Sequence, residues 1–278
     1  MFIYLDARSD AKAALDAYPK IPVTLCDDAY WQDRSRPPKH QSRQTMNANR
    51  AYARTADIDW LIHIDVNEFL VSDLPLETTL AALPDTITVA RARPVELLSA
   101  STDMFKAFIP AGPDRERTVA ALYPTYRPHL KGGFLSHLAG KVFARTDMPR
   151  VKQRMRNAFQ GPDMIKAEID LNDVQLAHCH ARTWDDWQSY FRYRHAEGSY
   201  RADLGPARAR GRCGITMHEL FTMIETDEGM PGLRAFYDEV CAATPALCAR
   251  LEAHGMLRRA LLYLDTHLAH HFPHATSI

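Results

Sequence analysis

Residues 59–70 of this chain read Asp-Trp-Leu-Ile-His-Ile-Asp-Val-Asn-Glu-Phe-Leu. The apolar run 60–64 has the composition of a short β-strand, and it stops at Asp65. Ligands of open α/β sheets bind beyond the carboxyl ends of the strands. An acid at this position is therefore the first candidate for a binding or catalytic site.

The elements around this segment alternate in a way that indicates an α/β fold. Strands are predicted over residues 2–6, 21–25, 60–64, 86–92, 141–145 and 174–179, and helices over residues 9–17 and 41–54. A strand–helix–strand–helix–strand order is typical of a mainly parallel sheet flanked by helices. We therefore expect residues 1–183 to form one α/β domain, in which residues 98–135 are long loops with short strands.

The last third of the chain has a different pattern. Apolar periodicity predicts helices over residues 184–202, 216–226, 231–252 and 256–271. Neither an internal repeat nor a low-complexity linker separates this part from the preceding one. We expect residues 184–278 to form a helical C-terminal region that extends the α/β domain.

The composition excludes several classes of function. The 278 residues are 46% hydrophobic and 24% charged with a formal net charge of zero, so nothing attracts the chain generally to nucleic acid. No apolar run approaches the roughly 20 residues that span a bilayer, and the N-terminus lacks the pattern of a signal peptide. The five cysteines form no Cys-x-x-Cys pair, which favours free thiols. We expect a cytoplasmic protein without a transmembrane segment and without a nucleic-acid partner.

The polar side chains after residue 64 suggest a metal site. Asp65, Asn67 and Glu68 lie within four residues, and in an extended stretch residues two apart point the same way. Asp65 and Asn67 are therefore expected to face one ligand. Mg²⁺ and Mn²⁺ prefer such oxygen ligands and keep waters and substrate phosphates in their shell. The alternative is a plain strand-to-helix turn in which Asp65 or Asn67 caps the next helix.

The same segment resembles the Trp-x-x-x-x-Asp-x-Asp-Glu-Phe signature of family 2-like bacterial glycosyltransferases, which are related to the eukaryotic family 92 enzymes. Trp60, Asp65, Glu68 and Phe69 match the signature, and Asn67 stands where the family has a second aspartate. Three further segments resemble the family in the same order, and the resemblance covers roughly residues 1–200. They are Arg43-Gln44-x-x-Asn47, His137-x-x-Gly140-Lys141-Val142-Phe143-x-Arg145 and Leu176-Ala177-His178-Cys179-His180-x-x-Thr183-Trp184-x-x-Trp187.

The resemblance implies the GT-A fold and a metal-dependent, inverting transfer of a sugar from a nucleotide-sugar donor. It implies a UDP-linked donor, a glycan or other acceptor, and Mn²⁺ or Mg²⁺ as cofactor. The metal would stabilise the leaving diphosphate as a Lewis acid. The candidate residues are Asp65 and Glu68 for catalysis, Asp6, Lys141 and Arg145 for substrate binding, and Asp65, Asn67, His178 and His180 for the metal.

Each of these assignments has a simpler alternative. His178 and His180 alternate at the end of a strand and share a face, but a histidine pair there can also be half-buried and hydrogen-bonded to the backbone. Lys141 follows a glycine at a strand start, where it can reach a diphosphate or remain solvated on an edge strand. We expect Asp65, Asn67 and at least one of the two histidines to converge on one cleft.

Two departures from the family pattern keep other functions open. Residues 2–6 resemble the second strand of the family layout, so we expect the usual first strand to be missing. Asn67 provides one negative charge fewer than aspartate, and Asn67→Asp is expected to tighten Mn²⁺ binding. One alternative is therefore a non-catalytic GT-A-fold binding protein. The other is a metal-dependent nucleotidyltransferase or phosphotransferase, although the glycine loop that cradles phosphates after the first strand is absent.

Overall fold

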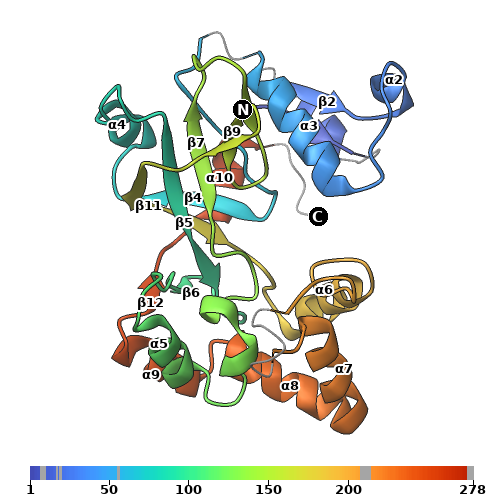
Figure 1. Cartoon of the computed structure of the whole chain (residues 1–278), viewed down its shortest axis with the longest axis vertical. Coiled ribbons are helices and arrows are strands. Elements are labelled where there is room, and N and C mark those ends of the chain that lie inside the picture. The colour runs from blue at the N-terminus through green and yellow to red at the C-terminus, as the bar shows by residue number, and fades with distance from the viewer. Residues whose placement is uncertain (7–10, 17, 19–20, 55–56, 207–213, 274–278) are drawn as a thin grey trace.

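The computed structural model describes residues 1–6, 11–16, 18, 21–54, 57–206 and 214–273, and over these residues the chain is an α/β protein (Figure 1). Its strands are β1 (Ile3–Leu5), β2 (Val23–Leu25), β3 (Trp60–Ile62), β4 (Glu68–Ser72), β5 (Val89–Leu97), β6 (Met104–Lys106), β7 (Lys141–Arg145), β8 (Val151–Gln153), β9 (Ala158–Gln160), β10 (Asp163–Ile165), β11 (Ile169–His178) and β12 (Leu257–Arg259). Its α-helices are α1 (Ala11–Asp16), α2 (Asp28–Trp31), α3 (His40–Tyr52), α4 (Leu76–Ala81), α5 (Arg115–Leu122), α6 (Trp184–Ala196), α7 (Met217–Asp227), α8 (Gly229–Val240), α9 (Pro245–Ala253) and α10 (Leu264–His271).

The main sheet has seven strands in the described part of the chain and is built around β5. The nine residues of β5 pair with β11 along one edge and with β7 and then β6 along the other. Beyond these neighbours, β11 pairs with β4, β7 with β3 and β6 with β12. The β5–β11 pairing is parallel, and the other pairings in this sheet are antiparallel.

The sheet is therefore mixed, which corrects the expectation of a mainly parallel sheet. The parallel pairing expected near the N-terminus occurs between β1 and β2, but these strands form a separate two-stranded sheet. Parallel neighbours need a crossover connection of a dozen or more residues, usually a helix. After residue 60, in the described part of the chain, β5 and β6 are antiparallel neighbours joined by a short loop, whereas the other antiparallel neighbours of this sheet are brought together from distant parts of the chain.

Four buried apolar clusters lie in the described part of the chain, and two of them show how the fold is held together. One lies against the middle of the sheet and includes Ala90, Phe143 and Leu176. The larger one joins the C-terminal helices through aromatic side chains, where the rings of Trp187 and Phe191 stack at 5.2 Å between centroids. Buried aromatic pairs of this kind add to the free energy gained by burying their area.

The C-terminal part is mainly helical, as predicted, but its elements differ in detail. The helix expected over residues 231–252 is divided into α8 and α9, and the range 256–271 contains the strand β12 before α10. The division has a local cause, because the hydroxyl of Thr244 accepts a hydrogen bond from Leu247 N and Pro245 occupies the first helical turn. Residues 98–135, expected to be loops with short strands, also contain α5.

Helix α1 confirms the helix predicted over residues 9–17, of which residues 9, 10 and 17 lie outside the described part. The four described cysteines are free, as the sequence predicted, and the fifth, Cys213, also lies outside that part. No helix in the described ranges is both long enough and apolar enough to cross a membrane.

Candidate functional site

The segment that carries Asp65, Asn67 and Glu68, which we call the acid turn, joins β3 to β4. Strand β3 ends at Ile62 and β4 begins at Glu68, so Asp65 lies beyond the carboxyl end of a strand, as predicted. The backbone N–H of Glu68 donates to the carbonyl oxygen of Asp65 (3.0 Å), and the backbone N–H of Asp65 donates to Glu68 Oε2 (2.7 Å). These two bonds close the turn on itself. Because the turn leads into a strand, the alternative of a helix cap is wrong.

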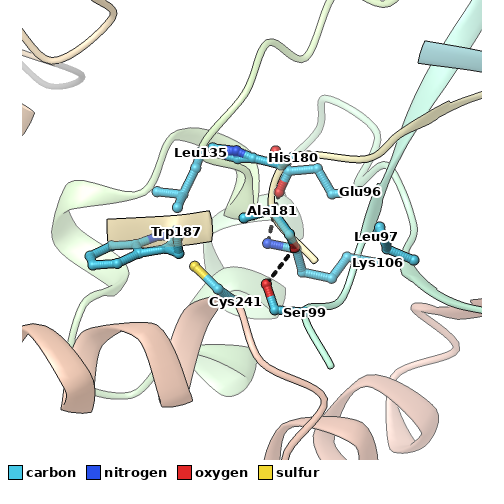
Figure 2. Close-up of a pocket in the computed structure, with 9 residues that line it drawn as sticks. All are labelled: Glu96, Leu97, Ser99, Lys106, Leu135, His180, Ala181, Trp187 and Cys241. Carbon is cyan, nitrogen blue, oxygen red and sulfur yellow. Dashed lines mark hydrogen bonds and ion pairs between the residues drawn. The ribbon is translucent and has the colours of Figure 1, made fainter. Parts of the chain in front are cut away.

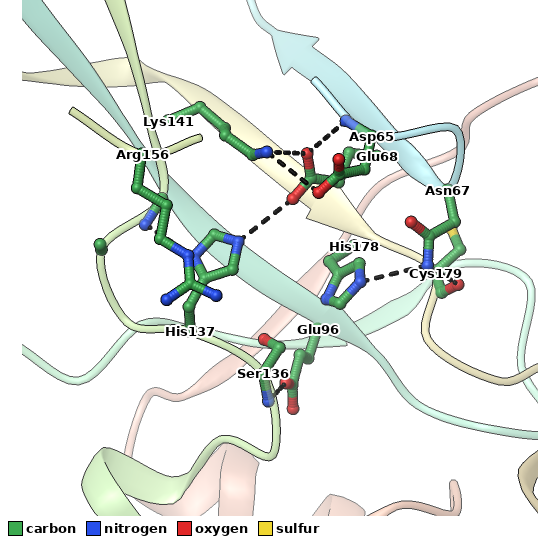
Figure 3. A network of polar contacts seen from close by, with 12 residues as sticks. Asp65, Asn67, Glu68, Glu96, Ser136, His137, Lys141, Arg156, His178 and Cys179 are labelled. Carbon is green, nitrogen blue, oxygen red and sulfur yellow. Dashed lines mark hydrogen bonds and ion pairs between the residues drawn. The ribbon is translucent and has the colours of Figure 1, made fainter. Parts of the chain in front are cut away.

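A buried lysine pairs with the two carboxylates of the turn. The Nζ of Lys141 lies 3.0 Å from Asp65 Oδ2 and 3.2 Å from Glu68 Oε2, and its side chain is 1% exposed (Figure 3). The lysine starts β7 directly after Gly140, which has φ +67° and passes so close to β5 that a Cβ would lie 2.0 Å from Ala92 O. Glycine is therefore required for this approach. The alternative of a solvated lysine is wrong, because the ammonium is buried between two carboxylates.

The neighbours of Glu68 lower the pKa of its carboxyl. Burial raises the pKa of its carboxyl, but the hydrogen bond from His137, the Lys141 ammonium and the N–H of Asp65 outweigh burial and bring the pKa to about 2. The tautomer of His137 follows from its contacts. Its Nδ1 accepts a hydrogen bond from Gly140 N (3.1 Å), so Nε2 carries the proton and donates to Glu68 Oε1 (3.2 Å). The Glu68 side chain, 1% exposed, positions the turn rather than reaching a ligand.

Asn67 points away from the lysine, toward the end of β11. Its Nδ2 donates to the carbonyl oxygen of Cys179 (3.3 Å) and lies 3.2 Å from His178 Nε2. The argument that Asp65 and Asn67 face one ligand assumed an extended backbone, and the bend at residues 66–67 removes that condition. The structure therefore brings Asn67 together with His178, and Asp65 together with Lys141.

His180 lies deeper than His178 and contacts Arg194. An Arg194 guanidinium nitrogen lies 2.8 Å from His180 Nδ1, and the imidazole is buried. Burial, and then the charge of Arg194, lower the pKa of His180 well below its ordinary value, so the ring is neutral. The ring borders a cavity of about 10 Å³, room for about one water, whose wall includes Trp187 and Cys241 (Figure 2).

The same cavity is bordered by an ion pair that the sequence did not single out. Glu96 Oε2 and Lys106 Nζ are 2.8 Å apart, and each side chain is 3% exposed. Lys106 also donates to the carbonyl oxygen of Val240 (3.0 Å), and Glu96 Oε1 accepts from Ser136 N (2.7 Å). Burial raises the pKa of Glu96, but the neighbouring ammonium of Lys106 reverses the effect and leaves the pKa well below its ordinary range.

Strand register places these charged groups in one row. His178 on β11 is the cross-strand partner of Glu68 on β4 and of Glu96 on β5, and Glu96 is the partner of Lys106 on β6. Cross-strand partners lie on the same face of a sheet. Four neighbouring strands therefore carry an acid, a histidine, an acid and a lysine side by side. Glu96 and Lys106 each stand between two apolar residues, and that pattern was the signal that could have identified them.

Helix α3 connects Asp6 to the acid turn. Its carboxylate pairs with Arg43 (2.7 Å between Arg43 Nη2 and Asp6 Oδ2). The next residue of that helix, Gln44, donates from Nε2 to Asp65 Oδ1 (3.0 Å). One helix thus holds the acids that follow β1 and β3, which were predicted to bind substrate and metal.

Arg145 lies at the opposite end of β7 from Lys141. Its guanidinium carbon is 4.6 Å from the ring centroid of Trp60, and its Nε donates to the carbonyl oxygen of Ile87 (3.0 Å). Lys141 and Arg145 are the first and last of the five residues of β7, so the structure does not bring Arg145 to the acid turn. Its contacts are those of a residue that packs the strand ends together.

Two side chains near the turn were missed by the sequence. Arg156 is exposed, and Figure 3 shows it beside His137. His63 precedes the turn, and burial followed by the charge of Lys141 lowers the pKa of its imidazole. The exposed guanidinium gives the site a cation that can meet an anionic ligand.

The arrangement fits a divalent metal only in part. Among the described residues, no three histidine, cysteine, aspartate or glutamate side chains are grouped as metal ligands. The 26% exposed side chain of Asp65 and the amide oxygen of Asn67 remain as oxygen donors. His178 Nε2 is already next to Asn67 Nδ2, and His180 is in contact with Arg194. Because these two residues face different neighbours, each oxygen would hold a hard cation only with water and phosphate completing the shell.

A scan against models of protein families finds no match for this chain, and a search of curated proteins finds no similar sequence. The resemblance to family 2-like glycosyltransferases therefore stays a prediction that depends on the four motifs. Residues of three of these motifs lie close together, because the Asp65 turn, the Gly140–Lys141 segment and the end of β11 meet in one network of polar contacts (Figure 3).

Proposed function

We propose that this chain is a glycosyltransferase with a variant of the GT-A fold. It transfers a sugar from a nucleotide-sugar donor, UDP-linked, to a glycan or other acceptor, with inversion. The observation that carries the proposal is the acid turn after β3, held by Lys141 and His137 from the segment at the start of β7 and by Gln44 from α3. A carboxylate fixed in this way is preorganised and needs no rearrangement when a charged ligand arrives.

The chain's own residues divide the work of binding the donor. Lys141 and Gln44 each hold one oxygen of Asp65, so the carboxylate keeps one orientation. Arg156, exposed beside the turn, meets the diphosphate of the donor. Asp65 would hold Mn²⁺ or Mg²⁺ by oxygen, and water and the phosphates of the donor would complete the shell. When bound, such an ion neutralises the charge that develops on the leaving diphosphate.

A second candidate is a GT-A-fold protein that binds a nucleotide without transferring a sugar. Both oxygens of Asp65 already accept hydrogen bonds from the protein, and Asn67 is neutral. These contacts weaken the attraction for a metal, which favours this candidate. Release of UDP from UDP-sugars over time separates the two functions, because a binding protein does not turn over. The four described free cysteines favour a reducing compartment such as the cytoplasm for either function.

Asp65→Ala is expected to abolish the Mn²⁺-dependent binding of UDP, because it removes the carboxylate that orients the turn and contacts the cation. Calorimetric titration of UDP with and without Mn²⁺ measures this effect. Asp59→Ala is the matched control, since Asp59 is an exposed acid just before β3. If Asp65→Ala binds UDP and Mn²⁺ as the wild type does, the turn is structural and the proposal fails.

A further inference from the structure

Four side chains near the acid turn have a buried polar atom that no hydrogen bond satisfies within the described part of the chain: Gln44 Oε1, His63 Nδ1, Ser136 Oγ and His178 Nδ1. Two of these atoms, His178 Nδ1 and Ser136 Oγ, belong to side chains next to Glu96. A buried polar atom left unpaired is costly, and a group in the folded protein or in a ligand usually satisfies it. These atoms therefore indicate what the site lacks.

The two unpaired atoms belong to side chains that flank one carboxylate. Ser136 donates its backbone N–H to Glu96 Oε1 (2.7 Å), and His178 is the cross-strand partner of Glu96. Figure 3 shows Ser136 and His178 on either side of the Glu96 strand, with His137 next to both. The rings of His137 and His178 are 6.3 Å apart between centroids. His178 therefore lies next to His137, the side chain that is hydrogen-bonded to Glu68.

The hydrogen-bonding character of this spot follows from the neighbours of His178. Its Nε2 lies against the amide nitrogen of Asn67, which donates, so Nε2 accepts and the proton is on Nδ1. The spot therefore offers one N–H donor from His178 and one hydroxyl from Ser136. A hydroxyl group is complementary to both, because it accepts one hydrogen bond while it donates another.

The spot lies just beneath the surface. Ser136, His137 and His178 are each partly exposed, but the two unpaired atoms are themselves buried, so a ligand contacts them only when a neighbouring side chain moves aside. The acid turn, where we place the diphosphate, is joined to His178 through Asn67. A sugar attached to that diphosphate would lie over His178 and Ser136.

We propose that His178 Nδ1 and Ser136 Oγ form a hydroxyl-binding subsite that takes one hydroxyl of the donor sugar, an inference that rests on the proposed function. The subsite makes these two residues specificity determinants, since they contact the sugar and leave the nucleotide untouched.

The test compares the affinities for UDP and for UDP-sugars. Calorimetric titrations of UDP, UDP-glucose, UDP-galactose and UDP-N-acetylglucosamine, each with Mn²⁺, are made on the wild type and on Ser136→Ala. The wild type is expected to bind one of the sugars more tightly than UDP. Ser136→Ala is expected to weaken that sugar by about threefold to tenfold, the range for one lost hydrogen bond, and to leave UDP unchanged. Ser189→Ala, at an exposed serine of α6, is the matched control.

Two substitutions of His178 separate its two nitrogens. His178→Asn keeps a donor near the position of Nδ1 and is expected to retain most of the preference for the sugar. His178→Gln keeps a polar group near Nε2, facing Asn67, and is expected to lose that preference. A residue that acts only on stability would not distinguish the two variants.

The outcomes separate this subsite from the function on which it rests. Failure of the wild type to bind UDP at all counts against the proposed function. Normal UDP binding with equal affinity for UDP and all three sugars overturns the subsite alone. A loss of affinity in Ser136→Ala that is as large for UDP as for the sugars also overturns the subsite, because the substitution would then act on the whole site.

Discussion

Asn67 fastens the acid turn to the end of β11. Its amide nitrogen donates to the carbonyl oxygen of Cys179, and the backbone N–H of Cys179 donates back to Asn67 O (2.9 Å). An aspartate has no N–H, so it would place a carboxylate against that carbonyl oxygen. The amide at this position therefore has a structural reason that the motif does not reveal.

At this scale we predict two opposing effects of Asn67→Asp. The added charge attracts Mn²⁺, as the sequence suggested, but the lost donor destabilises the protein by about 1–3 kcal/mol. Urea denaturation without metal measures the second effect. Asn172→Asp is the control, since Asn172 is exposed on β11. A variant as stable as the wild type would mean that the contact with Cys179 contributes little.

At the scale of the elements, the row across β4, β11, β5 and β6 holds charges inside the sheet. Glu96 and Lys106 neutralise each other at 2.8 Å, and each has further hydrogen bonds to the backbone. A buried pair of this kind adds little net stability compared with apolar residues, but removing one partner leaves an uncompensated charge. The pair therefore constrains which strands can be neighbours.

Lys106→Met is predicted to lower the free energy of unfolding by about 3–5 kcal/mol, because Glu96 would stay buried without its cation. The double variant Glu96→Met/Lys106→Met is predicted to lose less, although Ser136 N would lose its acceptor. Chemical denaturation of the three proteins decides the matter. Arg259→Met is the control: it breaks the Arg259–Asp103 pair, whose side chains are 61% and 31% exposed, and is expected to cost less than about 1 kcal/mol. A double variant less stable than Lys106→Met would contradict this account.

At the scale of the whole molecule, the buried row makes stability depend on pH. The pKa of Glu68 is about 2 in the folded protein, against an ordinary value of 4.5. Below pH 4.5 the unfolded chain binds the proton first, so the stabilisation is complete above that pH and is lost as the pH falls toward 2. Burial also lowers the pKa values of His178 and His180, which removes stability in the same direction below pH 6.5.

We predict that Glu68→Gln flattens the pH dependence of stability in acid. Glu68 alone should account for about 2 kcal/mol of the loss between pH 5 and pH 3. Urea midpoints at pH 7, 5 and 3 give the slope, and Glu77→Gln on α4 is the control because Glu77 is exposed. The variant is expected to be less stable than the wild type at pH 7, where Lys141 and His137 lose their partner. Parallel pH profiles for Glu68→Gln and the wild type would rule out this explanation.

The amino-acid sequence by itself determined the features that depend on neighbouring residues. These include the α/β class, the strand that ends before Asp65, the strand that starts at Lys141 and most helix positions after Trp184. They were predictable because apolar periodicity, caps and turn residues act over a few positions. The break between α8 and α9 was also encoded locally, by Thr244 and Pro245.

Only the tertiary structure decided which strands are neighbours and what each polar side chain meets. The mixed order of the sheet and the row from Glu68 to Lys106 depend on the register between distant segments, in which a shift of one residue turns every side chain to the other face. The bend at residues 66–67 sent Asp65 to Lys141 and Asn67 to His178, although their spacing suggested a common ligand. Local patterns carry no information about such contacts, because the partner of a charge is chosen by the folding of the whole chain.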